Sequence, residues 1–191
     1  MMNLCEYQNR ARDTAIYLDI PNTRMLYPAL GIVGECGEVS EKVKKLIRDD
    51  GGEMTPDRAV AVGKELGDCC WYLANICCDI DLELEMMYAM CGCSITQHMR
   101  ILTLPQLVIH LHRHATLIAG ALEILYYEYG GDIRHINRFP EIPNSLSNVI
   151  ACIEEIAHRC NLTLEEICAA NIEKLSIRKQ KGTLKGSGDD R

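Results

Sequence analysis

Aromatic residues are scarce in this chain, at 5% of 191 residues, with a single tryptophan and a single phenylalanine. Hydrophobic residues nevertheless make up 48% of the sequence, and they are mainly Leu, Ile, Ala, Met and Cys. This mixture favours helices over sheets, because strands draw on aromatic and β-branched side chains. We therefore expect an all-α protein with enough apolar side chains to bury a core.

The sequence also lacks a long apolar run, an export signal and a net positive charge. No apolar run approaches the length of a membrane span, and the polar stretch from Met1 to Arg12 does not resemble a signal peptide. The net charge of −7 argues against a nucleic-acid-binding surface. Eleven cysteines without an export signal indicate reduced thiols. We expect a cytoplasmic protein that binds neither nucleic acid nor membrane.

Apolar residues recur at helical spacing along most of the chain. Seven helices are predicted, over about 5–18, 28–48, 57–79, 82–91, 105–129, 145–159 and from 161 onward. The stretch Cys91–Thr96 is expected to be a boundary between two halves. The end, 179–191, is rich in Lys, Gly, Ser and Asp and has no periodicity, so it is expected to be a flexible tail.

The two halves share a pattern when they are overlaid with a shift of about eighty residues. Glu65-Leu-Gly-Asp68 lies over Ser145-Leu-Ser-Asn148, and Gly51-Gly52 lies near Gly130-Gly131. We interpret the chain as one domain, 1–191, built from two related helical hairpin units that form a single-chain pseudo-dimer. Its first half, 1–95, is expected to bind metal, and its second half, 100–178, is expected to be degenerate.

Four carboxylates carry the metal prediction. Glu35 and Glu38 are three residues apart, and so are Glu65 and Asp68, which places each pair on one helix face. One such pair alone is more often an ordinary solvated face. Two adjacent helices carrying both pairs would form a four-carboxylate site for a hard divalent cation, Mg²⁺, with Mn²⁺ as the alternative metal.

These residues resemble a known family. The pattern Glu35-x-x-Glu38, about 26 residues, and then Glu65-x-x-Asp68 resembles that of the MazG-like all-α nucleoside triphosphate pyrophosphohydrolases. The surrounding residues, Gly34-Glu-Cys-Gly-Glu-Val-Ser-Glu41 and Glu65-Leu-Gly-Asp-Cys-Cys-Trp-Tyr72, are similar to that family as well. That superfamily includes MazG, the dimeric dUTPases, the dCTP pyrophosphatases and phosphoribosyl-ATP pyrophosphohydrolase. The chain looks like its small MazG-like branch with an inserted or duplicated middle segment.

The resemblance implies Mg²⁺-dependent hydrolysis of ribo- or deoxyribonucleoside triphosphates to a monophosphate and pyrophosphate, in house-cleaning of the nucleotide pool. It also implies a homodimer or higher homo-oligomer. Glu38 is expected to orient or deprotonate the attacking water, and Tyr72 to line the nucleotide pocket. Three residues on one face of the last helix are expected to contact phosphate and sugar: Asn171, Lys174 and Arg178.

Other interpretations stay open at this stage. The enzyme could use phosphoribosyl-ATP, or the second half could have left a helical scaffold that binds nucleotide without hydrolysing it. Trp71 is expected either to stack on a base or to pack in the core. The run His110-x-His-x-His114 suggests zinc only weakly, because His110 and His114 alone share a helix face and no fourth ligand is evident.

Overall fold

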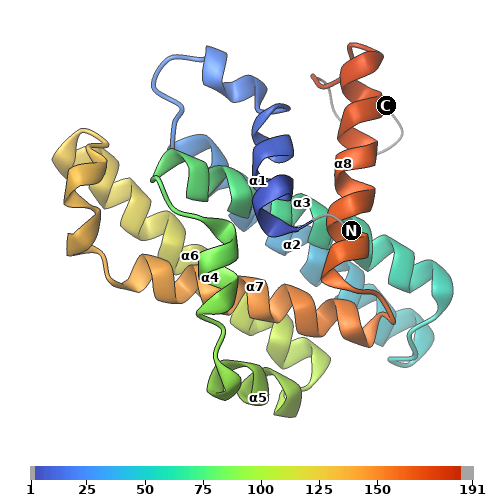
Figure 1. Ribbon diagram of the computed structural model, residues 1–191. Helices are drawn as coiled ribbons and strands as arrows, with labels where there is room; N and C mark the ends of the chain where they lie inside the picture. Colours follow the sequence, from blue (N-terminus) through green and yellow to red (C-terminus); the bar gives the residue numbers. More distant parts are fainter. Residues whose placement is uncertain (1–2, 186–191) are drawn as a thin grey trace.

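The computed structural model describes residues 3–185, and for residues 93 and 94 the backbone alone. The all-α prediction is confirmed, since every regular element in 3–185 is helical and no strand occurs there. Figure 1 shows the helices α1 (Leu4–Arg12), η1 (Ile16–Asp19), α2 (Leu26–Asp50), α3 (Pro56–Asp79), α4 (Leu84–Ala89), α5 (Cys93–Ile101), α6 (Leu104–Tyr129), η2 (Ile133–Arg138), α7 (Glu141–Arg159) and α8 (Leu164–Gln180). None of the described helices is long and apolar enough to cross a membrane.

The end of the first helix and the start of the C-terminal tail were predicted wrongly. The helix expected over 5–18 ends at Arg12, where the Thr14 hydroxyl donates to the carbonyl of Ala11, and the chain resumes as the 3-10 helix η1. Helix α5, which was not predicted, begins at Cys93, and the stretch Cys91–Thr96 as a boundary between two halves stays a prediction. The predicted tail also begins later, because Lys179 still belongs to α8, and positions 186–191 lie outside the described residues.

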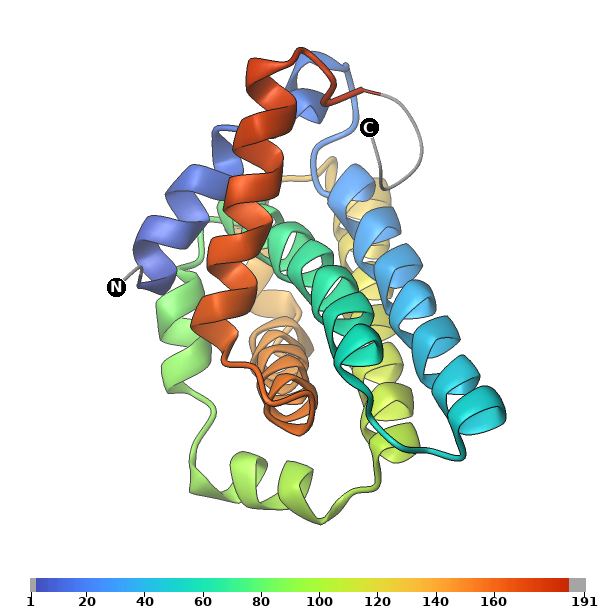
Figure 2. The same ribbon diagram turned by 90° about the vertical axis from the view of Figure 1, so that its right-hand side faces the viewer.

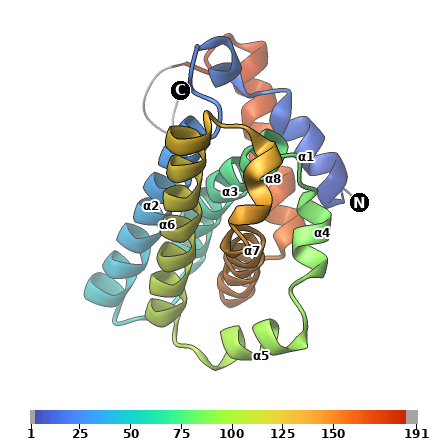
Figure 3. The ribbon, with the colours of Figure 1, turned by 90° about the vertical axis from the view of Figure 1, so that its left-hand side faces the viewer.

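The fold centres on a bundle of four long helices. In this bundle α2 packs against both α3 and α6, and α7 packs against α6 and also reaches α3. Figure 2 shows α2 and α3 side by side with α7 nearly end-on, and Figure 3 shows α2 beside α6 from the opposite side. Their inward faces form one continuous core, which includes the fully buried Ile32, Leu66, Leu73, Leu111 and Leu146.

The two halves end their helices in the same way. Gly51 after α2 and Gly130 after α6 both have φ of 62°, a left-handed conformation that glycine adopts without strain. Asp81 after α3 and Asn161 after α7 have φ of 58° and 57°. These positions follow the predicted shift of about eighty residues, while descent of the two units from one duplicated sequence stays a prediction.

The last helix of each half packs against the other half. Helix α8, which ends the second half, packs against α3 of the first half, and α4, which ends the first half, packs against α7 of the second. Because α8 packs against α3, its residues lie beside Glu65 and Asp68, which come about a hundred positions earlier in the chain.

Candidate functional site

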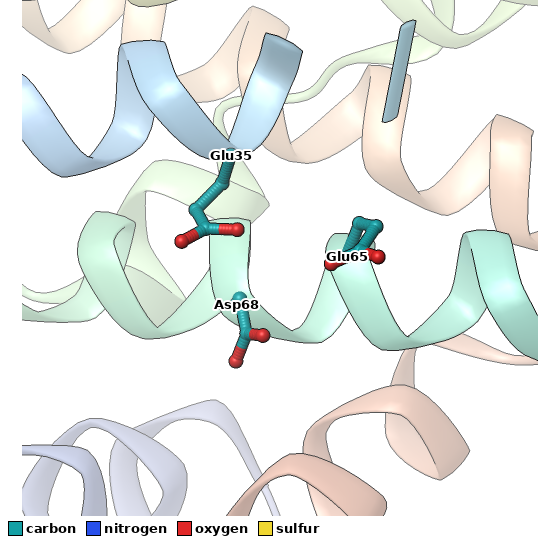
Figure 4. Close-up of side chains that lie close together, drawn as sticks. All are labelled: Glu35, Glu65 and Asp68. Carbon is teal, nitrogen blue, oxygen red and sulfur yellow. The ribbon is translucent and has the colours of Figure 1, made fainter. Parts of the chain in front are cut away.

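Three of the four predicted carboxylates come together between α2 and α3. Glu35 from α2 and Glu65 and Asp68 from α3 each offer a carboxylate oxygen, and these atoms all lie within 4.8 Å of one another (Figure 4). Glu65 is buried, and Glu35 and Asp68 are partly buried. Among the side chains described, no other group of three or more His, Cys, Asp or Glu residues gathers its ligand atoms in this way.

Glu38 does not join this group. It lies one turn beyond Glu35 on α2, it is exposed, and its carboxylate falls outside the 4.8 Å cluster. In the described part of the chain no side-chain hydrogen bond or ion pair holds it. Its charge still contributes to raising the pKa of Glu35. Helical spacing placed Glu38 on the correct face, but the spacing does not fix the direction of an exposed side chain.

Helix α8 completes the site from the other side of Asp68. Lys174 Nζ lies 2.6 Å from both Asp68 oxygens, and Asn171 Nδ2 donates to Asp68 Oδ1 at 2.9 Å. Asn171 is in turn oriented by the buried Tyr7, whose hydroxyl donates to Asn171 Oδ1 at 3.1 Å. Gly67 permits this approach, because a Cβ there would lie 3.1 Å from Cβ of Asn171. The structure thus brings Asn171 and Lys174 to the acidic motif.

A second lysine contacts the carboxylates from α2. Lys42 Nζ lies 3.0 Å from Glu65 Oε1. Neither Lys42 nor Tyr7 was predicted from the sequence as a site residue. A signal for Lys42 exists in its position seven residues after Glu35, on the same helix face. Glu41, by contrast, pairs with Lys45 at 2.8 Å on the helix surface and takes no part in the cluster.

The environment of Glu35 disfavours its charged form. Burial is the largest cause, followed by repulsion from Asp68 and Glu65, and together they raise the pKa of Glu35 to about 7. Lys174 lowers it only in part. Because the charged form of Glu35 is destabilised by its two neighbouring carboxylates, a cation bound among the three would be stabilised by all of them.

A cavity of about 110 Å³ opens beside Glu35 and Asp68. Its walls include Tyr27, Tyr72 and the buried guanidinium-bearing side chain of Arg178. Tyr72 lies at a tilted angle to Tyr27, with 6.3 Å between ring centroids. The predicted residues Tyr72 and Arg178 therefore do lie at the same hollow as the carboxylates.

Trp71 is explained largely by packing. Its indole Nε1 donates to the Thr14 hydroxyl at 2.8 Å and to the carbonyl of Ala11 at 3.1 Å, which fastens α3 to the end of α1. The ring also packs edge-on against Tyr72, at 4.9 Å between centroids. Trp71 thus supports one wall of the cavity.

The position of Tyr72 depends on Gly31, which yields a testable pair of variants. A Cβ at Gly31 would overlap the Tyr72 ring, whereas a Cβ at Gly34, one turn later, would meet nothing within 4 Å. We expect Gly31→Ala to lower the free energy of unfolding by about 1–3 kcal/mol. Gly34→Ala is expected to raise it by about 0.5–1 kcal/mol, because alanine favours the helix. Equal denaturation midpoints for the two variants would show that the Tyr72 ring does not constrain this turn of α2.

The second half carries neutral groups where the first half carries acids. His114 Nδ1 lies 3.2 Å from Ser145 Oγ, and His110 Nε2 lies 3.4 Å from Asn148 Oδ1. Burial and the neighbouring His110 lower the pKa of His114 to about 4, so its ring is neutral at pH 7. With no cluster of ligand atoms at these side chains within the described residues, the weak zinc interpretation finds no support.

Comparisons with known proteins place the chain in a family without assigning it an activity. No family profile and no solved structure matches the chain. The "Gene 37 protein" of Mycobacterium phage L5 is 38% identical to it over 88 residues, which cover 44% of this chain and 77% of the phage protein. The chain belongs to the family of this phage protein. Membership in the Gene 37 protein family carries no statement about chemistry, since that name is a gene number, so the function has to be argued from the site.

Proposed function

We propose that the protein is a MazG-like nucleoside triphosphate pyrophosphohydrolase. The observation that carries the proposal is the convergence of Glu35, Glu65 and Asp68 with the α8 residues Asn171 and Lys174. An acidic group that binds a divalent cation, next to a helix that supplies cations and an amide, suits a polyphosphate substrate. We propose further that the enzyme is cytoplasmic, forms a homodimer or higher homo-oligomer, and cleans the nucleotide pool.

The residues present fit a hard divalent cation such as Mg²⁺ or Mn²⁺. Glu35, Glu65 and Asp68 supply only oxygen donors, which these ions prefer, and few protein ligands suffice when phosphate and water complete the shell. A bound ion would neutralise charge on the phosphates and lower the pKa of a bound water. Burial is the largest cause of the raised pKa of Glu35, and the ion would relieve the repulsion from Asp68 and Glu65 that adds to it.

The remaining residues bind and orient the substrate. Lys174 and Arg178 present cationic groups, and Asn171 presents an amide held by Tyr7, along the face of α8 that meets α3. We expect Glu38, which is exposed one turn beyond Glu35, to orient or deprotonate the water. Tyr72 contributes an aromatic wall for the nucleoside.

The substrate must extend beyond the small cavity. Sites for small molecules usually span roughly 300–1,000 Å³, whereas the cavity beside Glu35 holds about 110 Å³. A groove of about 490 Å³ lies between α3 and α8, and Lys64 lines it together with Asn171 and Lys174. Asn171 and Lys174 also contact Asp68, which lines the small cavity. We propose that the polyphosphate bridges these two hollows at Asp68.

The direct test is an assay of pyrophosphate release with a panel of ribo- and deoxyribonucleoside triphosphates and phosphoribosyl-ATP. We expect turnover of at least one triphosphate in the presence of Mg²⁺ or Mn²⁺ and none after chelation of the metal. If phosphoribosyl-ATP alone were hydrolysed, the proposed reaction would stand and the proposed substrate would change to phosphoribosyl-ATP. Binding of a nucleotide with no turnover of any would overturn the enzyme proposal in favour of a non-catalytic scaffold.

A further inference from the structure

Two lysines already occupy the oxygen atoms that a metal ion would need. Lys174 Nζ contacts both oxygens of Asp68 at 2.6 Å, and Lys42 Nζ contacts Glu65 Oε1 at 3.0 Å. The lysine side chains are each 25% exposed, while the Glu65 side chain is 7% exposed. These contacts are therefore partly screened from water and stronger than ordinary surface ion pairs.

The lysines balance the acidic group. Three carboxylates within 4.8 Å repel one another, and an ammonium group beside two of them offsets that repulsion. Glu35 forms no ion pair within the described residues, and Lys174 lowers its pKa only in part, so Asp68 and Glu65 are the members of the group with a direct ammonium partner. An ammonium and a divalent cation compete for the same oxygens, so they cannot both hold Asp68 by its two oxygens.

The Lys174 side chain is able to move away from Asp68. Its charge sits on a flexible four-carbon stem with rotatable donors, unlike the fixed fork of arginine. It also lines the groove between α3 and α8, so its ammonium can turn from Asp68 into that space. Asn171, which Tyr7 orients, remains to hold Asp68 Oδ1 in place.

We propose that Lys174 and Lys42 are the counterions of Asp68 and Glu65 when no metal is bound. When a divalent cation binds Asp68, the Lys174 ammonium leaves that carboxylate and binds the polyphosphate instead; we call this step the exchange. This inference rests on the proposed function. It assigns to Lys42 a charge-balancing role at Glu65, and it makes metal and nucleotide binding mutually reinforcing. Lys174 released by one ligand becomes available to the other, and such coupling is reciprocal.

The test measures Mn²⁺ affinity by calorimetry in the absence of nucleotide. We expect Lys174→Met to bind Mn²⁺ about tenfold more tightly than the wild type, because a competing cation has been removed. Lys42→Met is expected to act in the same direction. The matched control is Lys45→Met, which makes the same charge change on α2 at a surface pair with Glu41, and it should shift affinity less than twofold. An affinity for Lys174→Met equal to or weaker than wild type would overturn the exchange.

A second arm uses a non-hydrolysable triphosphate analogue with Mn²⁺ present. Here Lys174→Met should bind the analogue at least tenfold more weakly than the wild type, while Lys174→Arg, which keeps the charge, should retain most of the affinity. Lys174→Met that binds the analogue as tightly as wild type would contradict the second role of Lys174.

The two proposals fail in different ways. Tighter Mn²⁺ binding by Lys174→Met together with no hydrolysis of any nucleotide would support the exchange and remove the enzymatic function. Metal-dependent hydrolysis with unchanged Mn²⁺ affinity in Lys174→Met would keep the function and remove the exchange. Absence of Mn²⁺ binding in the wild type would overturn both.

Discussion

Replacing Asp68 by asparagine is expected to lower the rate of pyrophosphate release by at least about a thousandfold. Asp68 stands at the centre of the site, facing Glu35 and held by Asn171 and Lys174. Asparagine has nearly the same size, so the fold is retained, but it supplies one neutral oxygen where the site needs an anionic ligand. The measurement is steady-state release of pyrophosphate at saturating Mg²⁺.

A control variant on the same helix separates this effect from a general loss of charge. Asp57 lies exposed in the first turn of α3, far along the helix from the carboxylate group. Asp57→Asn should leave the rate within about twofold of wild type. Glu38→Gln is expected to slow the reaction as well, because Glu38 is proposed to orient the water. Unchanged rates in both Glu38→Gln and Asp68→Asn would refute the site.

Lowering the pH from 8 to 6 is expected to weaken Mg²⁺ binding about tenfold. The pKa of Glu35 is raised to about 7 by burial and by repulsion from Asp68 and Glu65. Above that pH the carboxylate is ionised and free to bind the metal, and below it a proton must first be displaced. Calorimetric titrations at the two pH values measure the change, and Glu35→Gln should show weaker binding with little pH dependence over this range.

The same shift predicts a stability effect that needs no ligand. The raised pKa means that the folded protein holds this proton more tightly than the unfolded chain does, so stability is lost as pH rises from about 4.5 to about 7. At pH 8 in metal-free buffer, Glu35→Gln should be more stable than wild type by about 1–2 kcal/mol, once partial exposure is discounted. At pH 4 the two proteins should unfold alike. If Glu35→Gln had a lower free energy of unfolding than the wild type at pH 8, the charged form of Glu35 would not be destabilised by its surroundings.

The sequence predicted the long helices well because their apolar residues repeat at helical spacing. For 28–48, 57–79 and 105–129 the structure adds no more than two residues at an end. Helix α5 was missed because it is only nine residues long and follows Cys91-Gly92 directly, a stretch interpreted as a boundary between halves. The break after Arg12 depends on bonds of Thr14 with Ala11 and Trp71, and the bond to Trp71 joins residues 57 positions apart.

In the candidate site, too, the features set by helical spacing could be predicted and those set by packing between helices could not. Glu35, Glu65 and Asp68 could be predicted because helical spacing alone determines which face each occupies. The role of Tyr7 could not be predicted, and the helix face of Lys42 does not by itself identify Glu65 as its partner. Both contacts follow from the packing of α1, α2, α3 and α8 against one another. Glu38 was predicted to join the cluster and does not, because the helix face of an exposed residue does not determine where its carboxylate points.

The most direct test of the central claim is product identification by ³¹P NMR during the reaction of purified protein with Mg²⁺ and its preferred triphosphate. The proposed site predicts nucleoside monophosphate and pyrophosphate in equal amounts, with neither product formed by Asp68→Asn. Nucleoside diphosphate and inorganic phosphate as products, or no conversion of any triphosphate in the panel, would contradict it.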